Sequence, residues 1–232
     1  MAGDVPATLP RRGSSPLERG DVPLKARPRA DHVLLRAMRV LRDEGLRNFW
    51  FKLIGELGYR RMLVVAYRLE EPIPEFVPRL AVRNDVLGKS EVDAYLAFRP
   101  ESDRAELINR LDSGQLCFVA WHEGQIVSAC WTAARATRIP FLDWDCELAD
   151  GDAYLYDKFT SEAYRGQRLA NAVRVYQLQY LRNAGYRRAI GAVVPENRRA
   201  MLENRRGGFR PVGLIGRIKI GPWQRHFRRQ WE

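Results

Sequence analysis

The pattern of apolar and polar positions divides the chain into four parts. Residues 1–30 are rich in Pro, Gly, Arg and Ser and carry few large apolar side chains, which predicts a disordered basic arm. Residues 31–78 are predicted to form an amphipathic helical extension, a short strand and a proline-rich connector. The main domain is predicted at 79–221, and a basic, Trp-containing tail at 222–232.

The helical extension at 31–58 combines an apolar stripe with a basic face. The residues of the stripe recur at helical spacing: Leu34, Met38, Leu41, Leu46, Phe49, Trp50, Leu53, Ile54 and Leu57. One interpretation is that the stripe packs on the main domain, or on a second subunit in a homodimer. The other is that 31–58 lies in a membrane interface, with the aromatic residues inserted and the arginines against lipid phosphates.

Within the main domain the apolar period alternates between that of strands and that of helices. Helices are predicted at 89–98, 101–111 and 169–184. Strands are predicted at 80–83, 116–121, 125–134, 139–146, 153–160, 188–194, 209–214 and 215–220. The order of these elements predicts an α/β (α+β) fold, in which helices flank a mixed, mostly antiparallel twisted sheet.

One strand–helix–strand unit interrupts the antiparallel pattern. The strand at 153–160 is followed by the helix at 169–184 and then by the strand at 188–194. A crossover of this length joins parallel strands, so we expect the two strands to be parallel neighbours. A parallel pair within a mostly antiparallel sheet can splay apart and form a cleft.

The loop between the first strand and the helix of this unit has the features of an anion site. A helix leaves its first amide hydrogens unpaired and carries partial positive charge at that end. A diphosphate lying across residues 167–170 would satisfy both properties. The small residues Gly166 and Ala170 allow a ligand to approach the main chain.

Two linked motifs in this region resemble a known family. The run Arg165-Gly166-Gln167-Arg168-Leu169-Ala170 resembles the coenzyme A pyrophosphate loop of the GNAT superfamily of N-acetyltransferases, with the pattern Gln/Arg-x-x-Gly-x-Gly/Ala. Arg168 departs from the pattern because it stands where glycine is usual. The second motif runs from Asn197 through Ala200 to Gly208-Phe209, about thirty residues further on.

The resemblance implies that the splayed parallel pair forms an acyl-CoA cleft. Acetyl-CoA would then be the co-substrate, and no metal would be needed. The pantetheine arm would pair with the main chain of Phe159, Thr160 and Ser161. The remaining cofactor-binding residues implied by the motifs are Arg165, Gly166, Gln167, Arg168, Leu169, Ala170, Asn197 and Asn204.

The implied chemistry is direct attack of a neutral amine on the thioester, in which the protein contributes mainly positioning. Asp157 precedes Thr160 by three residues and is a candidate base. Pairing of Asp157 with one of the many arginines is an equally weighted alternative. In the family a tyrosine usually protonates the leaving group, and that position is Asn204 here. The alternatives are unassisted departure of the thiolate, protonation by Tyr164 or water, or a hydrogen bond from Asn204 to the sulfur.

The predicted function is acetyl (acyl) transfer from acetyl-CoA to a primary amine of an unidentified small molecule, sugar or peptide. Two alternatives stay open. One is a catalytically silent sensor or scaffold that binds acyl-CoA. The other is a membrane-associated adaptor, in which the basic ends of the chain matter more than the cleft.

Charge and composition limit the partners. The net charge is +11, and residues 198–232 hold ten Lys/Arg and two Glu, so 10 − 2 = +8 of it lies there. Steering of an anionic coenzyme or contact with an acidic membrane explains this excess. A nucleic-acid partner is disfavoured because neither a recognition helix nor an aromatic stacking motif is present.

The number of cysteines and the lengths of the apolar runs indicate the cellular compartment of the protein. Cys117, Cys130 and Cys146 are too few and too scattered for a disulfide framework or a metal site. No run of about 18 uncharged apolar residues occurs, and the N-terminus lacks the apolar centre of a signal peptide. We therefore expect a cytoplasmic protein, with peripheral attachment to the inner membrane face as the alternative for 31–58.

Overall fold

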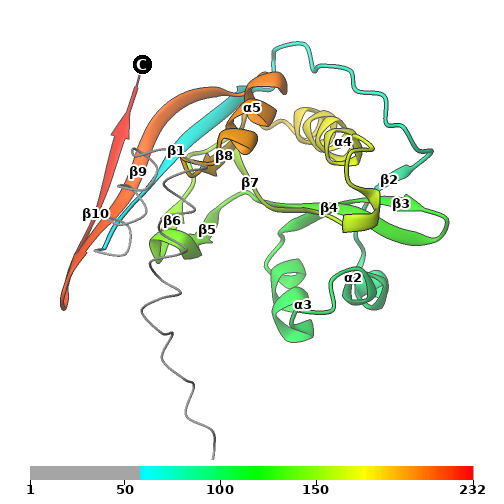
Figure 1. Cartoon of the computed structure of the whole chain (residues 1–232), viewed down its shortest axis with the longest axis horizontal. Coiled ribbons are helices and arrows are strands. Elements are labelled where there is room, and N and C mark those ends of the chain that lie inside the picture. The colour runs from blue at the N-terminus through cyan, green and yellow to red at the C-terminus, as the bar shows by residue number, and fades with distance from the viewer. Residues whose placement is uncertain (1–57, 232) are drawn as a thin grey trace, which may run out of the picture. The chain divides into compact units, whose positions relative to one another are not determined.

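The computed structural model describes residues 58–231, and its central feature is an eight-stranded sheet (Figure 1). Its strands are β1 (Tyr59–Arg68), β2 (Arg83–Val86), β3 (Leu116–His122), β4 (Gln125–Ala133), β7 (Asp152–Thr160), β8 (Arg188–Val193), β9 (Arg210–Ile220) and β10 (Trp223–Gln230). Their order in the sheet is β10-β9-β1-β8-β7-β4-β3-β2. The pair β7–β8 is parallel, and the other neighbours in this sheet are antiparallel.

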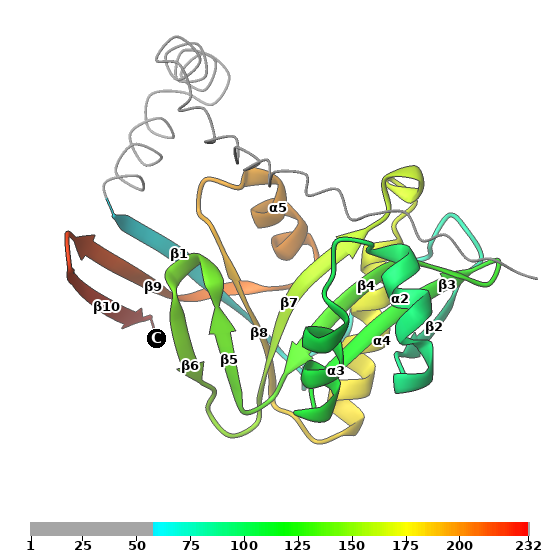
Figure 2. The ribbon, with the colours of Figure 1, turned by 90° about the horizontal axis from the view of Figure 1, so that it is seen from below.

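Four helices of the described residues cover the two faces of this sheet (Figure 2). They are α2 (Val92–Phe98), α3 (Arg104–Asp112), α4 (Leu169–Asn183) and α5 (Arg198–Arg206). Helices α2 and α3 lie on one face, together with the separate hairpin of β5 (Ala136–Ile139) and β6 (Trp144–Glu147). Helices α4 and α5 lie on the opposite face. The predicted mixed, mostly antiparallel sheet with flanking helices is confirmed.

The alternation of side chains along β3 explains why both faces are covered. Cys117 and Val119 point to α2 and α3, whereas Phe118 and Ala120 point to α4. All four are completely buried. A strand that is apolar on both sides needs a layer on each side, which the two helix pairs supply.

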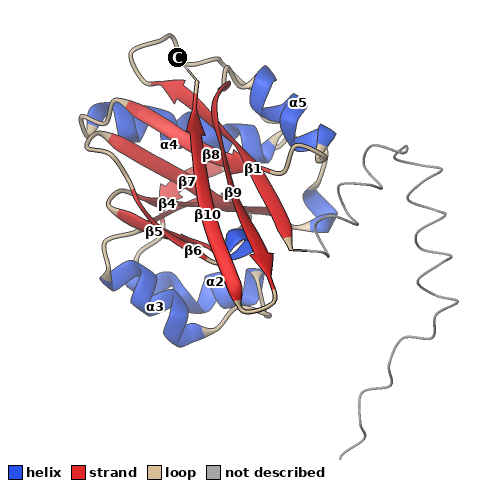
Figure 3. Cartoon of the chain, turned by 90° about the vertical axis from the view of Figure 1, so that its left-hand side faces the viewer, coloured by secondary structure: helices blue, strands red, loops and turns tan. Residues whose placement is uncertain are grey.

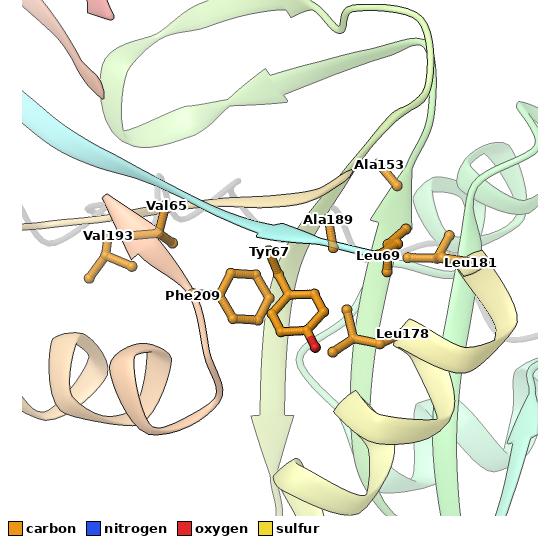
Figure 4. Close-up of a cluster of buried hydrophobic side chains, with 9 residues drawn as sticks. All are labelled: Val65, Tyr67, Leu69, Ala153, Leu178, Leu181, Ala189, Val193 and Phe209. Atoms are coloured by element: carbon orange, nitrogen blue, oxygen red, sulfur yellow. The ribbon is translucent and has the colours of Figure 1, made fainter. Parts of the chain in front are cut away.

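A second core joins β1, β8 and α4 to the segment after α5 (Figure 4). Tyr67 packs against Phe209, with ring centroids 5.5 Å apart, and Leu178 of α4 lies beside them. The Tyr67 hydroxyl donates to the carbonyl of Pro72 at 2.7 Å, which satisfies its polar end. This core fixes the position of Phe209 at the end of the second motif.

The sheet extends beyond the expected limits of the main domain at its N-terminal side. Strand β1 lies between β9 and β8, so the short strand assigned to the extension is a central strand of the sheet. The connector with three prolines crosses the molecule and is tied by the Arg79 amide, which donates to the Gln167 carbonyl at 3.0 Å. The prolines therefore mark a loop within the domain. The strand expected at 80–83 begins only at Arg83.

The C-terminal region also differs from the expectation. The predicted strands at 209–214 and 215–220 form the single strand β9, and most of the predicted tail forms β10 (Figure 3). The two strands are joined by Gly221 and Pro222, and Gly221 has φ +59°. Glycine with positive φ at the first position of a two-residue turn is favourable in a hairpin. The strand expected at 139–146 is likewise not continuous, because β5 ends at Ile139 and β6 begins at Trp144.

The predicted disordered arm at 1–30 and the predicted amphipathic helix lie outside the described residues, apart from Gly58. Among residues 58–231, no helix is both long and apolar enough to cross a membrane.

Candidate functional site

A cavity opens between the parallel strands β7 and β8. The two strands pair over only three residues, from Asp152–Arg188 to Tyr154–Ile190, and then separate. A cavity of about 300 Å³ lies where they diverge, and we call it the slot. Its lining residues on the two strands are Leu155, Tyr156, Asp157, Lys158, Gly191, Ala192 and Val193. The prediction of a splayed parallel pair is confirmed.

A β-bulge in β7 accounts for the divergence. Tyr156 pairs with Trp131 and Phe159 with Ala129, so two residues of β7 oppose Cys130 alone. A bulge bends its strand and increases the local twist. Its first residue, Asp157, has φ +46°, in the left-handed region that non-glycine residues rarely adopt. The bend carries the end of β7 away from β8.

Two arginines from separate helices hold the bulge residue. Arg99, which follows α2, donates to Asp157 Oδ1 at 2.6 Å, and Arg110 of α3 donates to Oδ2 at 3.1 Å. Burial opposes the charge on Arg99, but its hydrogen bonds to Asp157 and Glu101 outweigh burial and raise its pKa. The structure therefore shows the arginine-paired arrangement of Asp157, one of the two alternatives that the sequence leaves open.

The loop before α4 presents consecutive unpaired amides. Gly166 has φ +82° and Arg168 has φ +62°, and α4 begins at Leu169. The amides of residues 166–170 donate no hydrogen bond to any described residue. Successive main-chain N–H groups at a helix start form a concave anion site. Arg168 thus adopts the left-handed conformation that glycine favours.

The two arginines of this loop differ in their partners. Arg165 donates to Glu162 at 2.7 Å. Arg168 makes no ion pair with a carboxylate of the described residues. Of the two, Arg168 has its guanidinium available for a ligand.

The three residues expected to pair with the pantetheine arm have different main-chain environments. The Ser161 amide donates to Val127 at 3.0 Å, and the Ser161 carbonyl accepts from Tyr164 at 3.0 Å, so both groups are occupied. The Phe159 carbonyl accepts from the Ser128 hydroxyl at 3.2 Å. In an antiparallel ladder successive residues direct their main-chain groups to opposite edges, so those of Thr160 point away from β4.

Of the candidates Asn197, Asn204 and Tyr164, the two asparagines lie in the slot and the tyrosine lies elsewhere. Asn197 caps α5, its side chain accepting from the Ala200 amide at 3.0 Å, and Asn204 donates to the Ala200 carbonyl at 2.9 Å. Both asparagines line the slot. The Tyr164 ring instead packs against His122, with centroids 5.7 Å apart, and Tyr164 is not among the lining residues.

Sequence reasoning missed two polar residues of α4 that line the slot, Arg174 and Gln177. They are 8% and 0% exposed, respectively. A signal for them exists in the sequence, because positions 174 and 177 share a face of the helix with the buried Leu178 and Leu181. A charged residue on such a face is rare enough to mark a site.

Within residues 58–231, no group of three or more His, Cys, Asp or Glu side chains is arranged to hold a metal ion. The polar side chains that line the slot are those of Tyr156, Asp157, Lys158, Arg174, Gln177, Asn197 and Asn204.

Comparison with solved structures returned several acetyltransferases of low sequence identity. A GCN5-related N-acetyltransferase from Sphaerobacter thermophilus is 18% identical, with a TM-score of 0.48, and the alignment covers 78% of this chain and 56% of that one. A GCN5-related N-acetyltransferase from Kribbella flavida is 19% identical, with a TM-score of 0.46, and the coverage is 69% and 59%. The chain thus spans less than two thirds of the length of either protein.

A search of curated protein sequences found no match. A model of the acetyltransferase (GNAT) family matches residues 85–203. This segment is 119 of the 232 residues and includes β7, β8, the loop at 165–170 and α5 up to Glu203. The protein therefore belongs to the GNAT acetyltransferase family.

Proposed function

We propose that the protein transfers an acyl group from an acyl-CoA thioester to a primary amine, by direct attack within a ternary complex. The observation that carries the proposal is the slot beside the unpaired amides of residues 166–170. Members of the family use acetyl-CoA. The described residues present donors for a diphosphate at one end of the slot and an opening between two strands for the attached arm.

In this proposal the amides of residues 166–170 and the Arg168 guanidinium bind the diphosphate. The partial charge at the start of α4 favours the anion, and the positive φ of Gly166 and Arg168 aligns the amides. The pantetheine arm pairs with the main chain of Thr160. Asn197 and Asn204 form the far wall of the slot.

The chemical step needs no protein nucleophile. The amine nitrogen attacks the thioester carbonyl, the C–N bond forms, the C–S bond breaks, and the ammonium proton leaves to water while the thiolate is protonated. A main-chain amide near Thr160 stabilises the developing oxyanion. The Asn204 amide lines the slot and can donate to the sulfur.

Asp157 fits a positioning role better than that of a proton acceptor. Each of its carboxylate oxygens accepts from a guanidinium, and its backbone forms the bulge that opens the slot. Its contribution is therefore to hold the acceptor side of the slot in place, and water carries the proton away.

Calorimetric titration with coenzyme A tests the binding half of the proposal. Gly166→Glu places a carboxylate among the unpaired amides, and its Cβ meets no atom within 4 Å, so we expect at least tenfold weaker binding in a folded protein. Gly185→Glu is the matched control, because Gly185 has φ +83°, equally open surroundings, and lies beyond the other end of α4. Absence of binding heat with the wild-type protein would refute the proposal.

Release of free thiol tests the catalytic half. Acyl-CoA is supplied with panels of amino sugars, polyamines, amino acids and peptides, and at least one class should accelerate thiol release above the rate without amine. Binding of coenzyme A with no acceleration by any amine would instead identify an acyl-CoA-binding protein without transferase activity.

A further inference from the structure

Arg174 is a buried cation that faces the slot. Its side chain leaves α4 toward the opening between β7 and β8 and is 8% exposed. Nη1 donates one long hydrogen bond to the Glu203 carbonyl at 3.4 Å, and the guanidinium lies over the Phe209 ring, 5.0 Å from its centroid. A guanidinium has five N–H donors, so most of its hydrogen-bonding capacity is unused by the described residues.

Arg174 also lacks a counter-ion among the described residues. The Glu203 carboxylate acts on Arg174 electrostatically but forms no ion pair with it, and is held instead by Lys158 at 2.9 Å and by Arg199 at 3.2 Å. Burial lowers the pKa of the Arg174 guanidinium. Buried charges in proteins are normally paired, so an unpaired one at a cavity points to a missing anion.

A second polar group lies one helical turn further along the same face. Gln177 is fully buried, and its amide nitrogen donates to the Thr132 hydroxyl at 2.7 Å. The amide oxygen has no partner among the described residues, although Gln177 lines the slot. Buried amides are almost always satisfied at both ends. Arg174 and Gln177 together make this wall of the slot polar.

Their place in the slot indicates which part of a ligand they meet. The diphosphate site at residues 166–170 marks the end where the coenzyme enters. The opposite end is the point where β7 and β8 separate, between Leu155 and Gly191. Arg174 and Gln177 follow Ala170 along α4 by one and two turns, away from the diphosphate site. The acyl end of the donor therefore lies on their side.

We propose that the transferred acyl group carries a carboxylate, as in a malonyl or succinyl thioester, and that Arg174 binds this carboxylate. The inference rests on the proposed acyl-CoA transfer and names its donor. An acetyl group would leave the guanidinium unpaired, whereas a terminal carboxylate supplies the planar pair of acceptors that a guanidinium binds. The Gln177 amide then contributes the second polar contact of this pocket.

The transfer step is unchanged by this carboxylate. The amine forms a C–N bond with the thioester carbonyl, the C–S bond breaks, and coenzyme A leaves as the thiol after taking up a proton. The distal carboxylate stays ionised and bound to Arg174 throughout, so it acts only in recognition.

The experiment compares succinyl-CoA with butyryl-CoA, two four-carbon acyl thioesters that differ in the terminal carboxylate. Dissociation constants are measured calorimetrically, so no acceptor is required. We expect the wild-type protein to bind succinyl-CoA at least tenfold more tightly. Arg174→Met removes the charge at similar volume and should abolish the preference, Arg174→Lys should keep part of it, and Arg199→Met, an exposed arginine of α5, should leave it unchanged.

Two results would overturn the inference. One is equal or weaker binding of succinyl-CoA by the wild-type protein. The other is an equal loss of affinity for both thioesters in Arg174→Met, which would mean that Arg174 binds the coenzyme arm. Thermal unfolding of each variant establishes that it is folded. A charge preference without amine-dependent thiol release would refute transfer and leave the donor assignment standing.

Discussion

The two sides of the sheet at the slot differ in how their charges are paired. We call the α2–α3 side, which reaches the slot through Tyr156 and Asp157, the first wall, and the α4 side the second wall. On the α2–α3 side, Arg99 and Arg110 both reach Asp157, and Arg110 also stacks on Trp131 and Tyr156. On the α4 side, the amides of residues 166–170 donate to no described residue, and Arg174 lies over Phe209 but has no carboxylate partner among the described residues. The first wall is complete within the protein. The second has the unmet hydrogen-bonding capacity of a ligand site.

Backbone strain follows the same division. Asp157 and Arg168 both have positive φ without being glycine. The strain at Asp157 is offset by two ion pairs that the protein itself provides. Arg168 has no ion pair to a carboxylate of the described residues, so no such pair offsets the strain in the loop.

Removal of Asp157 should give the largest effect. Asp157→Ala leaves two partly buried guanidinium groups without their shared carboxylate, and we expect a loss of about 3 kcal/mol in the free energy of unfolding. Denaturant unfolding measures it. Asp145→Ala is the control, because Asp145 is exposed and contacts Arg138 at 3.5 Å, and it should cost under about 0.5 kcal/mol. An equal loss of stability in Asp157→Ala and Asp145→Ala would contradict the stabilising role of the ion pairs that Asp157 forms with Arg99 and Arg110.

Removal of the charge from the second wall should have the opposite sign. Arg174→Met replaces an unpaired buried cation by an apolar side chain of similar length, so the free energy of unfolding should stay unchanged or rise by about 1 kcal/mol. The measurement is the same denaturant titration, without ligand. A loss above about 2 kcal/mol would show that Arg174 is satisfied within the protein.

Features set by residues close together in the sequence could be predicted, whereas contacts between distant segments could not. The loop at 165–170 is a local motif, so the sequence was sufficient to show its resemblance to a known family, and the apolar spacing predicted the helix that follows. The parallel pair followed from the length of the crossover. The pairing of Asp157 with arginines at positions 99 and 110 depends on packing of distant segments, and sequence could offer it only as an alternative.

The places of β1 and β10 in the sheet were not predicted, for a different reason. Strand β1 precedes three prolines, and composition marked that stretch as a boundary although the chain only crosses the molecule there. Strand β10 is rich in arginine and mostly exposed, so its charges resembled those of a solvated tail. Its Gly-Pro turn was the overlooked signal. Both β1 and β10 belong to the sheet because they pair with strands that lie far away in the sequence or were not recognised as partners: β1 with β8 and β9, and β10 with β9.

Substitution of Arg168 tests the strain in the loop with a smaller expected effect. Arg168→Gly relieves about 1 kcal/mol of left-handed strain and adds roughly 0.5 kcal/mol of unfolded-chain entropy, so the protein should gain roughly 0.5 kcal/mol. Arg165→Gly is the matched control, because Arg165 has φ −66° and should lose stability instead. Thermal unfolding measures the change in stability of each variant. If both variants gained stability, or both lost it, the assignment of strain to Arg168 would be contradicted.

The smallest expected effect on stability concerns Glu203. Its measurement tests whether Glu203 acts as a counter-ion of Arg174. Burial alone would raise the pKa of Glu203, but Lys158 and Arg199 outweigh burial and lower it. A lowered pKa adds stability above the unfolded value near about 4.3, and this contribution disappears as the pH falls through the folded pKa. Because the side chain is 38% exposed, we expect under about 1 kcal/mol.

The stability difference between the wild-type protein and Glu203→Gln should therefore shrink between neutral pH and a pH below about 4. The same pair of measurements in an Arg174→Met background should give an unchanged profile, because Lys158 and Arg199 already hold the carboxylate. If the profile flattened in that background, Arg174 and Glu203 would be partners. The second wall would then be as internally paired as the first, and its need for an anionic ligand would disappear.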